Sequence, residues 1–147
     1  MTRAAEPVRV FADGALHGEI QQFYAWQVRL LDHGEAEAWA DTFTEDGVFE
    51  EVTKGEALRG RRAIAASARA RADAVAAEGV RRRHWFGMLD VRPQSDGTLH
   101  ATFYALVMAT PKGGGLSVYV SAEARDVLVP FDGTWLVRHR AVHHDAG

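Results

Sequence analysis

The chain has 147 residues, and 47% of them are hydrophobic, which is enough apolar material for the buried core of one domain. It contains no cysteine, so disulfide frameworks, thiolate-bound metal sites and cysteine nucleophiles are excluded, and its net charge of −3 argues against a nucleic-acid binder. No apolar run is long enough to span a bilayer, and residues 1–7 lack the apolar stretch of a secretory signal. We therefore expect a cytoplasmic protein that does not bind membranes.

The first predicted element is a long amphipathic helix. Apolar residues recur at helical spacing from Leu16 onward, Asp13 is placed to cap the start, and Gly34 is placed to end it. These signals predict a helix over residues 13–33. Gln27 lies on its apolar stripe, so one polar side chain is expected to face the core.

Two further helices and a short strand follow. A second helix is predicted over residues 35–43, and the turn at Glu45-Asp46-Gly47 leads into a short strand over residues 48–52. The segment 60–77 is rich in Ala and Arg and has few large apolar residues. We therefore expect it to form a helix that covers an edge of the structure.

The rest of the chain is predicted to be strands joined by hairpin turns. The expected strands cover residues 80–91, 99–110, 116–129 and 134–143. Helices followed by an antiparallel meander are typical of the α+β class. We predict one domain over residues 1–147, with its core over about residues 13–144, in which a curved antiparallel sheet wraps around the N-terminal helices.

Short motifs occur in a fixed order along the chain. They are Phe23-Tyr24, Leu30-Leu31-Asp32, Trp39, residues 43–48 (FTEDGV), residues 58–61 (LRGR), Arg83-His84 and residues 132–135 (DGTW). Their order and spacing resemble the nuclear transport factor 2-like (SnoaL-like) superfamily, over roughly residues 19–142. The resemblance implies a cone-shaped α+β barrel whose open end holds a small, largely apolar pocket.

Function varies widely within this superfamily, so the fold alone does not identify an activity. Three branches are similar to this chain. One is the scytalone dehydratase-like and polyketide cyclase or dehydratase group, which acts on small aromatic or polyketide substrates without a cofactor. The others are the ketosteroid isomerase-like group and the structural small subunit of ring-hydroxylating dioxygenases.

His84 is the leading candidate for chemistry. In its predicted strand it shares a face with Phe86 and Met88, so the imidazole lies among apolar side chains. A neutral His in that setting can take a proton next to a carbonyl or give one to a departing hydroxyl. The scytalone dehydratase-like group places a catalytic His in a similar Arg-His strand. The alternative is a core histidine that is hydrogen-bonded for structural reasons.

Asp32 closes the first helix and, by the same resemblance, would be the carboxylate that orients His84. A carboxylate near a helix C-terminus is disfavoured by the helix dipole, which favours a specific role, although Asp32-His33-Gly34 is also an ordinary polar helix end. Many relatives carry a Tyr five residues before this Asp. Gln27 occupies that position here, so Tyr24 is the candidate substitute and Gln27 a hydrogen-bonding contact.

Two further carboxylates match the ketosteroid isomerase-like pattern. Glu51 falls where that group keeps its general base, and Asp126 falls where it keeps a protonated acid that donates a hydrogen bond. Alternation places Asp126 in an apolar row of its strand, where burial favours the neutral acid. The alternatives are an ion pair of Asp126 with Arg138 or Arg140 and, for Glu51, an equal claim by Glu50.

Several large side chains are expected to contact the substrate together with Gln27 and Glu51. They are Trp39, Phe49, Phe86, Met88 and Tyr104. Trp85 points to the opposite side of its strand from His84. We expect it to pack under the helix over residues 60–77 or at a subunit contact.

The C-terminal histidines suggest a metal site at first sight. His139 and His143 are four residues apart, which in a strand separates them by about 13 Å, too far for one metal ion. His143, His144 and Asp145 lie at the end of the sequence, where a frayed polar tail is usual. We therefore predict neither a metal site nor a cofactor.

Two classes of function remain. The first is a cofactor-independent enzyme of secondary metabolism that dehydrates, cyclises or isomerises a small hydrophobic polyketide or aromatic ketone. His84 would be its base, oriented by Asp32, with Asp126 or Tyr24 as hydrogen-bond donor. The second is a non-catalytic small subunit of a ring-hydroxylating dioxygenase or a ligand-binding scaffold. The superfamily also implies a homodimer formed through sheet faces.

Overall fold

The fold is described by a computed structural model that covers residues 12–146. In chain order its elements are α1 (Gly14–Asp32), α2 (Ala36–Ala40), β1 (Phe43–Glu51), the 3-10 helix η1 (Val52–Lys54), β2 (Glu56–Arg59), α3 (Arg61–Ala77), β3 (Val80–Pro93), β4 (Leu99–Pro111), β5 (Ser117–Phe131) and β6 (Thr134–His144). None of the helices in this range is long and apolar enough to cross a membrane. The expectation about a secretory signal concerns residues outside the described range.

The first helix forms as predicted. The Asp13 side chain accepts a hydrogen bond from the Leu16 backbone N–H at 2.8 Å, which satisfies one of the free donors at the start of α1. Gly34 follows the helix with a φ of 75°, a conformation that glycine adopts without strain. The predicted range of residues 13–33 therefore matches α1 and its two capping residues.

The predicted second helix is too long, and one strand was not predicted. Thr42 donates to the Trp39 carbonyl from its backbone N–H at 3.0 Å and from its hydroxyl at 2.6 Å, so the chain leaves the helical path and β1 begins at Phe43. Strand β2 escaped prediction because three of its four residues are exposed, and it shows no alternation of polar and apolar residues.

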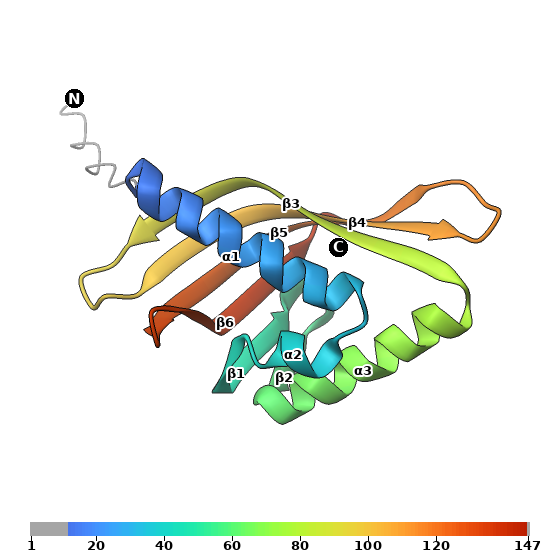
Figure 1. Cartoon of the computed structure of the whole chain (residues 1–147), viewed down its shortest axis with the longest axis horizontal. Helices are drawn as coiled ribbons and strands as arrows, with labels where there is room; N and C mark the ends of the chain where they lie inside the picture. Colours follow the sequence, from blue (N-terminus) through green and yellow to red (C-terminus); the bar gives the residue numbers. More distant parts are fainter. Residues whose placement is uncertain (1–11, 147) are drawn as a thin grey trace.

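The strands form one sheet in the order β2-β1-β6-β5-β4-β3. Strands β3 to β6 make the predicted antiparallel meander, but β1 pairs with β6 in parallel. The expectation of a wholly antiparallel sheet is therefore wrong. Helix α3 carries the chain from β2 to the far edge strand β3, so the last strand of the meander returns beside β1 in the same direction (Figure 1).

The curved sheet does not close into a barrel. Strands β2 and β3 are its two edges, and α3 contacts both of them (Figure 1). The barrel that the resemblance implied is thus an open cone. Helix α3, and not hydrogen bonding between β2 and β3, closes the opening between the two edges. The predicted edge-covering role of this helix is confirmed, because only Ile64 and Ala68 of α3 are buried.

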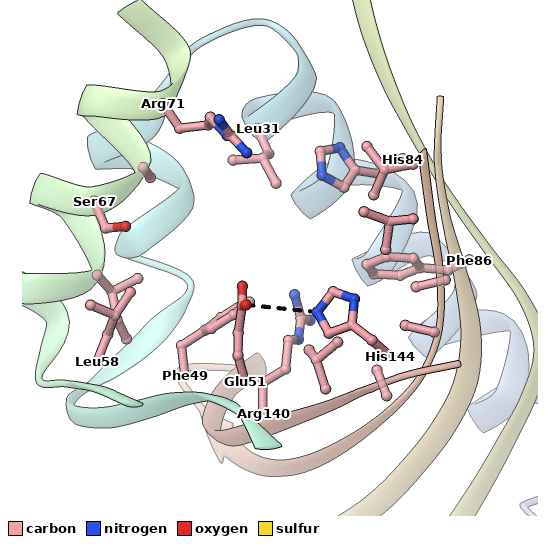
Figure 2. A pocket seen from close by; sticks show the side chains of 18 of the residues that line it. Leu31, Phe49, Glu51, Leu58, Ser67, Arg71, His84, Phe86, Arg140 and His144 are labelled. Atoms are coloured by element: carbon pink, nitrogen blue, oxygen red, sulfur yellow. Dashed lines mark ion pairs between the residues drawn. The ribbon is translucent and has the colours of Figure 1, made fainter. Parts of the chain in front are cut away.

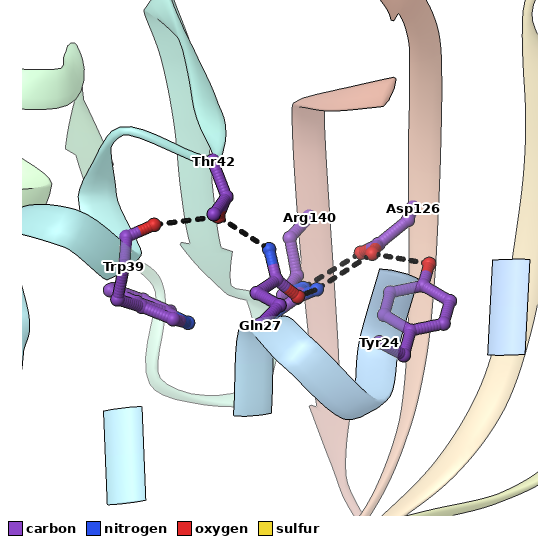
Figure 3. A network of polar contacts seen from close by, with 6 residues as sticks. All are labelled: Tyr24, Gln27, Trp39, Thr42, Asp126 and Arg140. Carbon is purple, nitrogen blue, oxygen red and sulfur yellow. Dashed lines mark hydrogen bonds and ion pairs between the residues drawn. The ribbon is translucent and has the colours of Figure 1, made fainter. Parts of the chain in front are cut away.

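A network of polar side chains crosses the core between α1 and the sheet. Arg140 donates from Nε and Nη2 to the two Asp126 oxygens, each at 2.8 Å, and the Tyr24 hydroxyl donates to Asp126 Oδ2 at 2.7 Å (Figure 3). Gln27 accepts from Arg140 Nη2 at 2.8 Å and donates to Thr42 Oγ1 at 2.7 Å. These five residues are each less than 5% exposed, so each polar group depends on the others for its partners.

Aromatic rings surround the cation of this network. The guanidinium carbon of Arg140 lies between 5.4 and 5.9 Å from four ring centroids, those of Tyr24, Phe43, Phe86 and Phe103. Burial lowers the pKa of Arg140, but the charge and hydrogen bonds of Asp126 outweigh that effect and raise the pKa overall. The guanidinium therefore stays charged inside the core.

We predict that Asp126→Ala lowers the free energy of unfolding by about 3–5 kcal/mol, because it leaves the buried Arg140 cation without its counter-ion. Urea unfolding measures the change. Asp90→Ala is the matched control, since it removes the partner of Arg92 in a pair whose side chains are 52% and 35% exposed, and it costs about 0–1 kcal/mol. Equal losses in the two variants would contradict the prediction.

A second prediction concerns alkaline pH. Burial, followed by the charge of Asp126, raises the pKa of Tyr24 well above the ordinary value of 10.0. Above that pH the unfolded chain loses the phenolic proton while the folded chain keeps it, so the stabilisation is complete below pH 10.0 and is lost as the pH rises. We expect the stability difference between the wild type and Tyr24→Phe to shrink above pH 10.0 in urea titrations. A stability difference that stays the same above that pH would contradict the raised pKa of Tyr24. Tyr104→Phe, which changes an exposed tyrosine, is the control.

Candidate active site

The concave face of the sheet and α3 enclose a cavity of about 390 Å³. Its floor is formed by alternate residues of the central strands, and three of these are the alanines Ala105, Ala122 and Ala124. Ala105 lies opposite Ala122 in the β4–β5 register, and both are buried. Because the alanine side chains are short, the sheet and the helices remain separated there and leave room for a small molecule.

His84 lines one wall of this cavity, and Asp32 contacts it from behind that wall. His84 Nδ1 lies 2.6 Å from Asp32 Oδ1, and the His84 backbone N–H donates to Asp32 Oδ2 at 3.2 Å. The His84 side chain is 14% exposed and that of Asp32 is 5% exposed. The last residue of α1 is thus held against β3, which gives a specific reason for a carboxylate at an unfavourable helix end.

This contact sets the orientation of the imidazole. With Nδ1 donating to the Asp32 carboxylate, Nε2 carries the free lone pair of the neutral ring. His84 lines the cavity and points into it from β3 (Figure 2). The arrangement can accept a proton at Nε2 and hold the resulting positive charge beside Asp32.

A second pair of titratable side chains lies on another wall. Glu51 ends β1, His144 ends β6, and their Oε2 and Nε2 atoms are 3.6 Å apart (Figure 2). Lys54 Nζ lies 2.9 Å from the same Glu51 oxygen. The Glu51 contact raises the pKa of Lys54. Glu50 instead faces His139 outside the cavity, at 3.0 Å, so Glu51 is the carboxylate that reaches the site.

His144 corrects the expectation of a frayed C-terminal tail. Its backbone N–H donates to Thr53 Oγ1 at 2.8 Å, and it pairs with Ala122 of β5. Alternation along β6 therefore turns Arg140, Val142 and His144 toward the cavity. The same alternation could have revealed His144 from the sequence had the strand been extended by one residue.

Some of the residues expected to contact the substrate line the cavity, and others lie outside it. Trp39, Phe49, Glu51 and Phe86 line the cavity. Met88 is 77% exposed and lies outside it, because a bulge between Gly87 and Asp90 interrupts the alternation, and Met88 adopts a φ of 53° there. Tyr104 is 58% exposed, because it alternates with the buried Phe103 and so faces outward.

Three other expected site residues belong to the core network instead. Gln27 and Tyr24 are buried away from the cavity, and their polar groups are held by Arg140, Thr42 and Asp126. Asp126 accepts three hydrogen bonds and does not line the cavity, so the expectation that it donates a hydrogen bond to a ligand there is wrong. The alternative ion pair with Arg140 is confirmed.

The structure adds cationic side chains to the site. Arg140 lines the cavity as well as anchoring the network, and Arg71 of α3 and Arg82 of β3 also line it. Of these three, the sequence indicated only Arg140, as an ion-pair partner. Arg71 and Arg82 could not be assigned because arginines are frequent throughout their segments and only the packing of α3 against the sheet selects these two.

Two remaining expectations concern metals and Trp85. Within residues 12–146, no three His, Cys, Asp or Glu side chains converge in a way that could hold a metal ion. Trp85 does not pack under α3, because it is 64% exposed on the outer side of β3.

Comparisons with known proteins identify the family. The model of the SnoaL-like domain matches residues 15–141. The chain is 34% identical to Aln2 from a Streptomyces species, with a TM-score of 0.85 over 92% of this chain and 94% of that one. It is 34% identical to ActVI-ORFA from Streptomyces coelicolor, with a TM-score of 0.80 over 90% and 99% of the two chains.

A third similar structure contains a ligand. It is a protein from Catenulispora acidiphila in complex with S-DNPA, 42% identical to this chain, with a TM-score of 0.76 over 90% and 96% of the two chains.

No curated protein matches the chain. The family match covers most of the sequence and agrees with the open cone, its cavity and the motifs that suggested the superfamily. The chain therefore belongs to the SnoaL-like domain family and has the nuclear transport factor 2-like fold, with a cavity for a small molecule.

Proposed function

We propose that the protein is a cofactor-independent acid–base enzyme that dehydrates or cyclises a small hydrophobic polyketide or aromatic ketone. One observation carries the proposal: the His84–Asp32 contact of 2.6 Å stands at the wall of a cavity lined mainly by apolar side chains. An imidazole that is oriented on one nitrogen and free on the other is suited to remove a proton next to a carbonyl.

In the proposed reaction, His84 Nε2 takes the proton from the carbon next to the substrate ketone. The positive imidazolium is then stabilised by Asp32 on its other nitrogen. The negative charge that develops on the ketone oxygen needs a donor, and Arg140 is the buried cation that lines the cavity. Arg140 thus replaces Asp126 and Tyr24, the donors that the sequence suggested.

The relatives support a small-molecule ligand. A protein 42% identical to this chain has been solved with S-DNPA, and the similarity to Aln2 and ActVI-ORFA extends over nearly the whole chain. The cavity volume of about 390 Å³ and its aromatic walls suit a compact aromatic molecule.

We predict that the wild type converts 3-hydroxy-1-tetralone to 1-naphthol and water, and that it exchanges the proton next to the ketone of 1-tetralone in deuterated water. His84→Ala should lower both rates by about 10²–10⁴-fold, because the base is removed. Absorbance measures naphthol formation, and proton NMR measures exchange. Asp32→Asn should lower both rates as well, since the single amide oxygen cannot serve both the backbone N–H and Nδ1 of His84 and carries no negative charge to stabilise the imidazolium.

His100→Ala provides the control, because His100 is an exposed histidine on the neighbouring strand β4. It should leave both rates unchanged. Equal activity in the wild type and His84→Ala would rule out the proposed base. Binding of both tetralones without exchange or dehydration would favour a ligand-binding scaffold over an enzyme.

We also propose that two copies of the chain pair through the outer face of the sheet. Trp85 and Leu106 are register partners on this face and are 64% and 39% exposed, and Tyr104 beside them is 58% exposed. Exposed aromatic side chains gathered on one face favour a protein contact. Sedimentation should show a dimer for the wild type and a monomer for Trp85→Glu; a monomeric wild type would contradict this.

A further inference from the structure

The contact between Glu51 and His144 is incomplete. Their facing atoms, Oε2 and Nε2, are buried but stand 3.6 Å apart, which is longer than a hydrogen bond. No hydrogen-bond partner for His144 Nε2 is present within residues 12–146. A buried nitrogen without a partner is costly, so these two atoms are suited to a group that can bind both.

A hydroxyl group has the required chemistry. Its oxygen can accept a hydrogen bond from His144 Nε2–H while its proton is donated to Glu51 Oε2. Neither an apolar group nor a bare carbonyl oxygen satisfies both atoms, since a carbonyl cannot donate to the carboxylate. The pair is therefore suited to a ligand that carries a hydroxyl.

The position of the pair relates this hydroxyl to the reaction. Glu51 and His144 come from β1 and β6, which are neighbouring strands. His84 comes from β3, the edge strand that β5 and β4 separate from β6, and all three residues line the same cavity (Figure 2). A compact ring system in the cavity can therefore present an acidic C–H to His84 and a hydroxyl to His144 at the same time.

We propose that Glu51 and His144 bind the hydroxyl group that the substrate loses and that protonated His144 is the general acid for its departure. The inference rests on the proposed dehydratase function and deepens it, because it assigns the residues that bind and protonate the departing hydroxyl group. Glu51 holds the His144 imidazolium as an ion pair and accepts a hydrogen bond from the hydroxyl, which keeps its own proton.

The step balances in protons and electrons. His84 Nε2 removes the proton next to the ketone, and the electron pair of that C–H bond forms the new carbon–carbon double bond. The carbon–oxygen bond breaks, and the hydroxyl leaves with the proton from His144 Nε2 as water. His84 ends protonated and His144 neutral, so solvent returns one proton to His144 and takes one from His84. No oxidant, reductant or cofactor is required.

Two reactions separate this role from the role of His84. Exchange of the proton next to the ketone in 1-tetralone breaks no carbon–oxygen bond, whereas dehydration of 3-hydroxy-1-tetralone breaks one. We expect His144→Gln to lower dehydration by at least about 100-fold while exchange stays within about 3-fold of the wild type. Glu51→Gln should lower dehydration in the same selective way, which provides a second variant if the first is poorly folded.

The chain contains a matched control pair. His139 and Glu50 are neighbouring residues of the same two strands, with Nε2 and Oε1 3.0 Å apart, but they lie outside the cavity and their side chains are about 40% exposed. His139→Gln and Glu50→Gln should leave both rates unchanged. Circular dichroism of all four variants checks that they are folded.

The outcomes are distinguishable. Selective loss of dehydration in His144→Gln and Glu51→Gln supports the proposal. Equal loss of exchange and dehydration, or loss of neither, overturns it and leaves the proposed function intact. A wild type that catalyses neither reaction overturns the proposed function, and this inference with it.

Discussion

The structure depends on the ion pair between Arg140 and Asp126 in the core. It joins the two strands next to each other at the centre of the sheet, β5 and β6, and through Tyr24 and Gln27 it fixes α1 against them. A buried guanidinium is tolerated because it donates to Asp126 and Gln27 and lies close to four aromatic rings. Arg140 also lines the cavity, so the residue that organises the core brings a positive charge to the candidate site.

The cavity exists because the sheet is curved but open. Short side chains on the inner faces of β4 and β5 leave space between the sheet and the helices, and α3 covers the side that the strands leave open. Since α3 has few buried residues, it contributes more to enclosing the cavity than to the core. The interior is therefore divided into a packed half around the ion pair and a hollow half beside α3.

The hollow half brings together residues that lie far apart in the chain. Asp32 and His84 are 52 positions apart and meet only because the end of α1 packs beside β3. Glu51 and His144 meet because β1 and β6 pair in parallel and end at the same side of the sheet. These two imidazole–carboxylate pairs are the basis of the proposed removal and delivery of a proton.

The order of the elements and the α+β class could be predicted from the sequence, because periodicity and capping residues are encoded over short stretches. Through the resemblance of its local motifs, the sequence also indicated the superfamily and the pairing of His84 with Asp32. It also indicated a buried polar residue at Gln27 and the ion pair of Asp126 as one of two alternatives. The tertiary structure was needed to show that Asp126 and Tyr24 belong to the core and that Met88 faces solvent, because alternation reveals neither a bulge nor the partners of a buried group. It alone placed His144 in the cavity, since that position depends on the parallel pairing of β1 with β6, a contact between the two ends of the fold.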